Sequence, residues 1–204
     1  MNTLIGAGIP RLEDGPLLKG HGRFVDDIAL PGVLQAAFVR SPHPHALIAR
    51  VDTRAAAALP GVDAVLTLEG IVPVLAQRRM VRHSNSGIPL GRLWPFALAD
   101  REVSYVGEPV AIVIAEDRYV AEDAAALVEV EYELLPAVAD CRNAIAPDVA
   151  AIRRELNSNV VTTFTVAYGD ADAALAEAAH IFHEELWQHR GSGHPIECRG
   201  LAGR

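Results

Sequence analysis

The most constraining feature of this sequence is a short, uniformly apolar run, Val110–Ala115, bounded by Glu108 and Glu116. An apolar run of this length without alternation predicts a strand that is buried on both faces. It is too short for a membrane span, which needs about 20 apolar residues. Asp117 follows and can cap a helix whose apolar residues recur at three- and four-residue spacing. We therefore expect a central strand covered by an amphipathic helix.

Shorter predicted elements flank this centre. Apolar, β-rich or alternating segments predict further strands at Val33–Val39, Ala46–Val51, Val62–Leu68, Val103–Val106 and Glu129–Glu133. A short alanine helix is expected between Thr53 and Pro60, because Thr53 offers a cap and Pro60 ends the helix. Residues 69–101 show no period, which indicates a long irregular connection. The elements form two β-α-β passages in an α+β fold.

The C-terminal part of the chain predicts a second, smaller group of elements. Pro, Asn and Ala dominate residues 141–159, as in a linker. A strand at Val160–Ala167, a helix capped by Asp170 and ending at Ala179, and a strand at His180–Gln188 should follow. The expected division is an extended leader over 1–17, a main domain over 18–140, the linker, and an incomplete second domain over 160–204.

Composition bounds the class of protein. Half of the 204 residues are apolar and 22% are charged, as in folded globular proteins. The net charge of −8 argues against nucleic-acid binding, which depends on Lys and Arg neutralising phosphates. No signal sequence or apolar span is visible, and Cys141 and Cys198 make no metal or disulfide pattern. We expect a soluble, cytoplasmic protein that binds neither nucleic acid nor membrane.

Several polar patterns could carry chemistry, but each has a structural explanation. The adjacent carboxylates are Glu13–Asp14, Asp26–Asp27, Glu116–Asp117 and Glu122–Asp123. Adjacent side chains point apart, and Asp before a turn or helix is a cap, so we assign no catalytic acid. The glycine pairs Gly6/Gly8 and Gly20/Gly22 do not join a strand to a helix, so we expect no phosphate site there.

Histidines and arginines form the remaining candidates. His43 and His45 could chelate zinc if a third ligand arrived, but structural or solvent-facing roles are favoured, as for His180 and His183. His189 and His194 lie in a glycine-rich segment that gives them no orientation. A basic cluster, comprising Arg78, Arg79, Arg82, His83 and Arg92, predicts a solvated or partner-facing loop more strongly than an anion site. The sequence identifies no catalytic, cofactor-binding or metal-ligating residue.

A series of sequence segments resembles the large subunits of molybdenum-cofactor hydroxylases, which form the xanthine dehydrogenase and aldehyde oxidase family. The segments, in the family's order, are Arg11–Gly32, Phe38–Ala46, Pro60–Thr67, Val103–Ala111, Glu116–Ala124 and Val128–Val138. The resemblance implies an α/β hammerhead domain up to about residue 140. Gly169–Ala178 and Pro195–Gly200 resemble the first elements of the molybdopterin-binding domain. Cys198 stands where family members usually have proline, which changes the backbone constraint at that turn.

The resemblance also implies an activity. Intact members hydroxylate aldehydes, purines, other heteroaromatics or carbon monoxide at a Mo-molybdopterin centre, and electrons leave through 2Fe-2S and FAD subunits. The family's cofactor loop and catalytic glutamate lie beyond the matched region, so none of their roles transfers to this chain. We therefore expect a truncated or split subunit that is inactive alone and works with the remainder of the molybdopterin-binding subunit. The alternatives are a non-catalytic assembly module and a decayed fragment.

Overall fold

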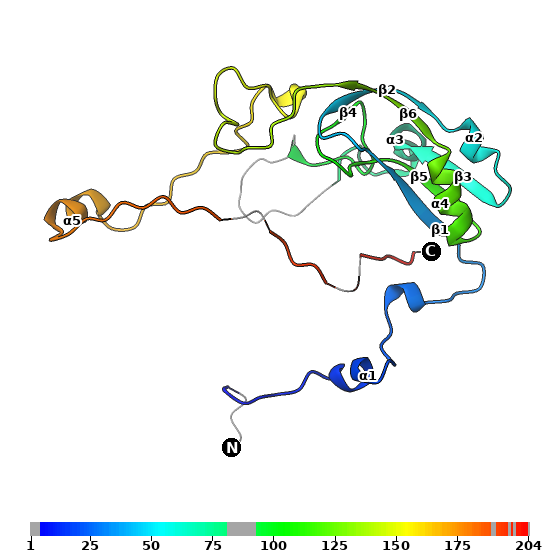
Figure 1. Ribbon diagram of the computed structural model, residues 1–204, viewed down its shortest axis with the longest axis horizontal. Coiled ribbons are helices and arrows are strands. Elements are labelled where there is room, and N and C mark those ends of the chain that lie inside the picture. The colour runs from blue at the N-terminus through cyan, green and yellow to red at the C-terminus, as the bar shows by residue number, and fades with distance from the viewer. Residues whose placement is uncertain (1–4, 81–92, 189–190, 196, 198, 204) are drawn as a thin grey trace. The chain divides into compact units, whose positions relative to one another are not determined.

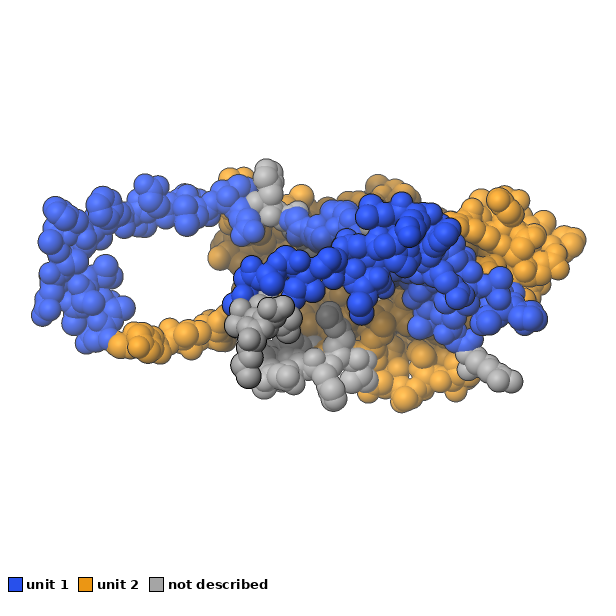
Figure 2. All heavy atoms as spheres, turned by 90° about the horizontal axis from the view of Figure 1, so that it is seen from below, with its two compact units in different colours: residues 1–33, 170–204 blue, residues 34–169 orange. Residues whose placement is uncertain are grey.

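The computed structural model describes residues 5–80, 93–188, 191–195, 197 and 199–203 (Figure 1). The chain divides into two compact units. Unit 1 combines residues 1–33 with 170–204, and unit 2 comprises residues 34–169 (Figure 2). Most of the regular secondary structure belongs to unit 2. Unit 1 contains the short helices α1 (Asp14–Leu18) and α5 (Ala171–Glu177) and the 3-10 turn η1 (Val25–Asp27).

The first sheet of unit 2 is built around the apolar run. Strand β5 (Pro109–Ala115) lies between β1 (Gln35–Arg40) and β3 (Val62–Thr67) and is antiparallel to both. Val113 pairs with Ala37 on one side and with Val65 on the other. The strand is buried or half-buried at every residue, and the prediction of a central strand is confirmed.

Helix α4 (Arg118–Ala126) packs against β1 and β5. Its predicted cap is confirmed, because the Asp117 carboxylate accepts a hydrogen bond from the Val120 amide at 2.8 Å. Ala121 and Ala124 are buried on its inner face. Alanines leave room for a close approach of helix and sheet, and Ala124 joins Val113 in one apolar cluster. These small side chains thus suit a closely packed helix and sheet.

A second antiparallel sheet has the order β4-β2-β6. Its strands are β4 (Glu102–Val103), β2 (Ala46–Asp52) and β6 (Glu129–Leu134). Ala46 and Val103 are fully buried and form a second apolar cluster with Val110 of β5. In β6 the charged residues are exposed and Val130 and Tyr132 are half-buried, as the alternating sequence predicts. The expected strand 103–106 is reduced to two residues that begin at Glu102.

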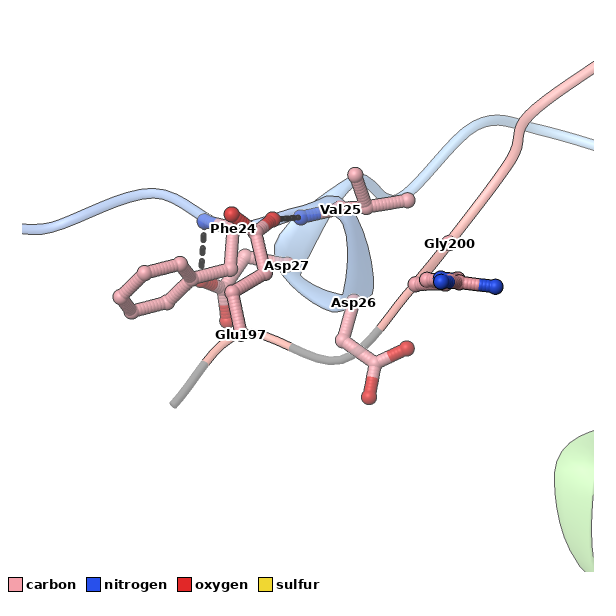
Figure 3. Close-up of a pocket in the computed structure, with 7 residues that line it drawn as sticks. Phe24, Val25, Asp26, Asp27, Glu197 and Gly200 are labelled. Carbon is pink, nitrogen blue, oxygen red and sulfur yellow. Dashed lines mark hydrogen bonds between the residues drawn. The ribbon is translucent and has the colours of Figure 1, made fainter. Parts of the chain in front are cut away.

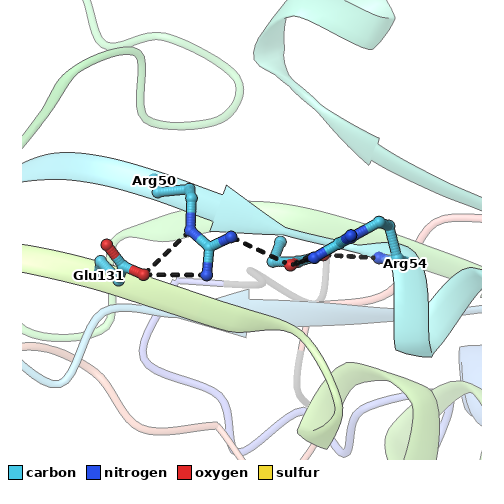
Figure 4. Close-up of polar contacts among 4 residues, drawn as sticks. Arg50, Arg54 and Glu131 are labelled. Carbon is cyan, nitrogen blue, oxygen red and sulfur yellow. Dashed lines mark hydrogen bonds and ion pairs between the residues drawn. The ribbon is translucent and has the colours of Figure 1, made fainter.

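Short helical turns join the two sheets. They are α2 (Arg54–Ala57), α3 (Leu68–Ile71) and the 3-10 turn η2 (Val72–Val74). An exposed ion-pair network runs across β2 into α2 (Figure 4). Arg50 contacts Glu131 at 2.9 Å and Asp52 at 3.3 Å, and Arg54 also pairs with Asp52. The hydrogen bond from Arg54 holds the pKa of Asp52 well below its usual range.

The sequence-based prediction of two strands in the C-terminal part of the chain is wrong. Residues 160–167 and 180–188 are extended but belong to no sheet in the described part of the chain. Their large apolar side chains are exposed, for example Val166 and Phe182. Extended segments need a neighbour for their backbone amides and carbonyls, and these segments have no strand beside them. The helix between them is confirmed as α5, which Asp170 caps through the Ala173 amide at 3.0 Å, although it ends at Glu177.

Candidate functional site

A pocket of about 230 Å³ in unit 2 is lined mainly by polar and charged side chains. Its lining residues come from β4 and the segment before it, from the turn between β4 and β5, and from residues 153–155: Phe96, Asp100, Arg101, Glu102, Ser104, Glu108, Arg153 and Glu155. Asp100, Arg101 and Glu102 are consecutive in the sequence, whereas Glu108, Arg153 and Glu155 come from other parts of the chain. Folding therefore creates this cluster from separate segments.

Glu108 is the buried carboxylate of this pocket. Its residue is only 8% exposed, and its Oε2 accepts a hydrogen bond from the Ser104 amide at 2.6 Å. Burial raises the pKa of Glu108, while the Ser104 amide and the Arg153 charge act in the opposite direction. The turn that presents Glu108 depends on Gly107, whose φ of 89° is in the left-handed region. Glu108 stands between Gly107 and Pro109 without an adjacent carboxylate, so no paired-carboxylate pattern in the sequence singles it out.

His45 is tied into the same region. The residue is 3% exposed, its Nδ1 lies 2.6 Å from the Pro136 carbonyl oxygen, and its Nε2 lies 2.8 Å from Glu102 Oε1. Both ring nitrogens therefore have protein partners, as expected of a structural histidine. The His43 ring instead packs edge-on against Tyr132, with 5.0 Å between ring centroids. Across the described residues, no three His, Cys, Asp or Glu side chains gather as metal ligands.

The basic cluster differs from its prediction. Arg78 contacts Glu69 at 2.6 Å and Asp100 at 2.7 Å, and the hydrogen bond that it donates to the Glu69 carboxylate raises the pKa of Arg78. Arg79 contacts Glu155 at 2.6 Å and is only 22% exposed. These two arginines pair with carboxylates of the same unit and are not freely solvated, and the partner-facing role of the loop stays a prediction. Arg82, His83 and Arg92 lie outside the described residues.

Unit 1 has its own pocket of about 220 Å³, between the η1 turn and the segment around Glu197 (Figure 3). The Val25 amide donates to Glu197 Oε1 at 3.0 Å, and the Phe24 amide donates to Asp27 Oδ2 at 2.9 Å. Asp27 thus has the turn role predicted for the Asp26–Asp27 pair. Cys198, the departure from the family pattern, lies outside the described residues, and Cys141 is an exposed, reduced thiol.

Neither pocket fits an anionic cofactor. Among the described residues, the unit 1 pocket is lined by the carboxylates Asp26, Asp27 and Glu197 with Arg199 as its one cation. Four carboxylates and two arginines line the unit 2 pocket. Molybdopterin carries a phosphate, which such an excess of carboxylates repels. We therefore derive no chemical step through a molybdenum centre from the residues of this chain.

The described part of the chain contains no helix long and apolar enough to cross a membrane. Two small antiparallel sheets with one packed helix define a mixed α+β domain. Residues 19–136 match the family model for the a/b hammerhead domain of aldehyde oxidase and xanthine dehydrogenase, and the chain belongs to this family. The family membership predicted from the sequence resemblance is confirmed, and the predicted α+β fold class is confirmed as well. The family comprises molybdenum hydroxylase oxidoreductases.

The relatives that this chain matches are about four times as long as the chain. It is 39% identical to the nicotine 6-hydroxylase large subunit of Paenarthrobacter nicotinovorans, covering 97% of this chain and 24% of that one. It is 38% identical to the carbon monoxide dehydrogenase large chain of Afipia carboxidovorans, covering 97% and 25%. The crystal structure of the Cu,Mo-CO dehydrogenase aligns with a TM-score of 0.67 and 37% identity, over 85% and 22%. The chain thus spans about a quarter of the length of these relatives.

Proposed function

We propose that this chain supplies the hammerhead domain of a molybdenum hydroxylase large subunit. The complete enzyme would be an oxidoreductase acting on an aldehyde, a purine, another heteroaromatic or carbon monoxide. The observation that carries the proposal is the family match over residues 19–136, which covers both sheets and helix α4. Relatives named for nicotine hydroxylation and carbon monoxide oxidation support these substrate classes.

In this proposal the chain is a structural part of the enzyme and is not catalytic alone. The hammerhead domain comprises residues 18–140, the linker 141–159, and the start of the molybdopterin-binding domain 160–204. The carboxylate-lined pockets support this role, because they disfavour an anionic cofactor. The remainder of the large subunit holds Mo-molybdopterin, and separate subunits carry the 2Fe-2S and FAD groups that remove electrons.

Two measurements on the purified chain test this role. Elemental analysis is expected to find no molybdenum above the buffer blank, and dye reduction is expected to be absent with each of the four substrate classes. Stoichiometric molybdenum together with substrate-dependent dye reduction by the chain alone would overturn the proposal. A relative's complete enzyme, assayed in parallel, shows that the assay detects the activity.

Affinity capture from the source organism's extract then identifies the partner. We expect the tagged chain to recover a polypeptide carrying the rest of a molybdopterin-binding subunit, together with molybdenum. The matched control is the chain with Val113→Asp, whose folded core is disrupted and which should recover neither. Capture of the same polypeptide by both forms would argue against a role for the folded domain.

A second candidate function is a non-catalytic module that assembles a multi-subunit oxidoreductase. Exposed apolar side chains favour it, because Phe164 is 72% and Phe182 89% exposed and such residues often mark binding surfaces. In the capture experiment, recovery of iron-sulfur or flavin subunits without a cofactor-binding polypeptide would favour the module over the enzyme part.

A further inference from the structure

The Asn159 side chain links three points of an irregular loop of unit 2, residues 144–160. Asn159 Nδ2 donates to the carbonyl oxygens of Ala144 at 2.8 Å and Ala150 at 2.9 Å. Its Oδ1 accepts from the Ile152 amide at 2.7 Å. These bonds satisfy backbone groups that have no helix or sheet partner. The loop is therefore organised internally and can move as one body.

The loop is attached to the rest of unit 2 through the 3-10 turn η4 (Arg154–Leu156). The Arg154 amide donates to Glu102 Oε1 at 3.3 Å, which is a long bond. Glu155 makes the stronger attachment, since Arg79 Nη2 donates to both of its carboxylate oxygens at 2.6 Å. Most of the attachment therefore depends on the contact between Arg79 and Glu155.

Arg79 is held in place by contacts of its own. Its Nη1 donates to the Trp94 carbonyl oxygen at 2.7 Å, and its guanidinium carbon lies 4.1 Å from the centroid of the Phe96 ring. A planar guanidinium can stack on a ring and donate in two directions at once, which a lysine ammonium cannot. Arg79 is therefore positioned to receive Glu155 with little loss of side-chain entropy.

The attached turn covers the carboxylate pocket. Arg153 and Glu155 line that pocket together with Ser104 and the buried Glu108. Residues 153–155 thus form one wall, and the segments around β4 and β5 form the others. Displacing this wall would admit water to Glu108 while leaving both sheets intact.

We propose that residues 153–155 are a strap that closes the pocket over Glu108, and that Arg79 is the latch that holds the strap shut. Opening breaks the contacts of η4 with Arg79 and Glu102 and releases loop 144–160 as a body. The strap is a conformational device within this chain, and it does not depend on the molybdenum enzyme proposed above.

Hydrogen exchange of the full-length chain tests the latch. In Arg79→Lys, amides of residues 150–158 should exchange about tenfold faster, while amides of β5 keep their wild-type rates. The matched control is Arg118→Lys, which alters an exposed helical ion pair with Glu122. Equal exchange in the two variants would overturn the proposal. Faster exchange in β5 as well would also overturn it, because Arg79 would then stabilise the whole unit.

Two further measurements separate a strap from a general structural role. Glu155→Gln should accelerate the same amides, and the double variant with Arg79→Lys should be no faster than the quicker single variant, since both remove one contact. Independent, multiplicative effects would contradict a single latch.

Discussion

Two segments with similar strand-forming sequences have opposite fates in this protein. Val110–Ala115 becomes the buried central strand of a sheet, whereas Val160–Ala167 stays extended and exposed outside both sheets. Both are rich in β-branched or other apolar residues. The difference is that β5 has neighbours on each edge and a helix on one face. Strand propensity is therefore expressed only where backbone partners and a packing surface are available.

Substituting a charge into each segment gives the largest expected contrast. Val113→Asp places an unpaired carboxylate at a fully buried position. It should lower the free energy of unfolding by at least ~3 kcal/mol, which is enough to abolish the cooperative unfolding transition. Val166→Asp changes an 82% exposed position and should alter the free energy of unfolding by less than about 0.5 kcal/mol. Urea unfolding followed by circular dichroism measures both. Similar losses would show that residue 166 is packed in solution.

The helix caps sharpen the comparison at a smaller scale. Asp117→Ala removes the cap of α4, which packs on the first sheet, and should destabilise unit 2 by about 1 kcal/mol. Asp170→Ala removes the cap of the exposed helix α5 and should unfold that helix locally without changing the main transition. Thermal unfolding reports the first effect and hydrogen exchange the second. A lower melting temperature in Asp170→Ala would mean that α5 belongs to the same cooperative unit.

Glu108 gives a pH-dependent contrast within unit 2. Burial raises the pKa of Glu108 in the folded state above its value in the unfolded state. The contribution of this residue to the free energy of unfolding is therefore fully present below the unfolded-state pKa and is lost as the pH rises through the folded-state pKa. Glu108→Gln keeps an acceptor for the Ser104 amide without the charge, so the variant should be more stable than wild type at pH 7, by a few degrees in melting temperature. The difference should shrink toward pH 4. A variant less stable at pH 7 would show that the ionised carboxylate is favourable.

The surface ion pairs should have the smallest effect. Arg50→Gln breaks exposed contacts with Asp52 and Glu131 and is expected to cost less than about 0.5 kcal/mol, with the loss reduced further by high salt. Urea titrations at low and high ionic strength measure this change in the free energy of unfolding. A larger decrease that does not depend on salt would indicate that Arg50 stabilises the sheet through packing of its aliphatic stem.

Much of unit 2 could be predicted from the sequence, because its signals are local. The buried run and the alternation of β6 follow from hydrophobic pattern, and the cap at Asp117 from the residue before a periodic segment. The segments that resemble the family predicted a hammerhead domain over residues 18–140, and the family model matches residues 19–136. The failures concern contacts between distant segments, such as Arg79 with Glu155, which no spacing rule connects.

The sequence by itself determined which segments of this protein are apolar enough to be buried and where α4 begins, because both depend on residues within a few positions of one another. Only the tertiary structure decided that β5 lies between β1 and β3, that Glu108 becomes a buried carboxylate, and that residues 160–167 remain without a sheet. These outcomes depend on contacts between residues that are distant in the sequence. A strand needs backbone hydrogen-bond partners on a neighbouring strand, and the pKa of a carboxyl group shifts only when other parts of the chain bury it or place charges beside it.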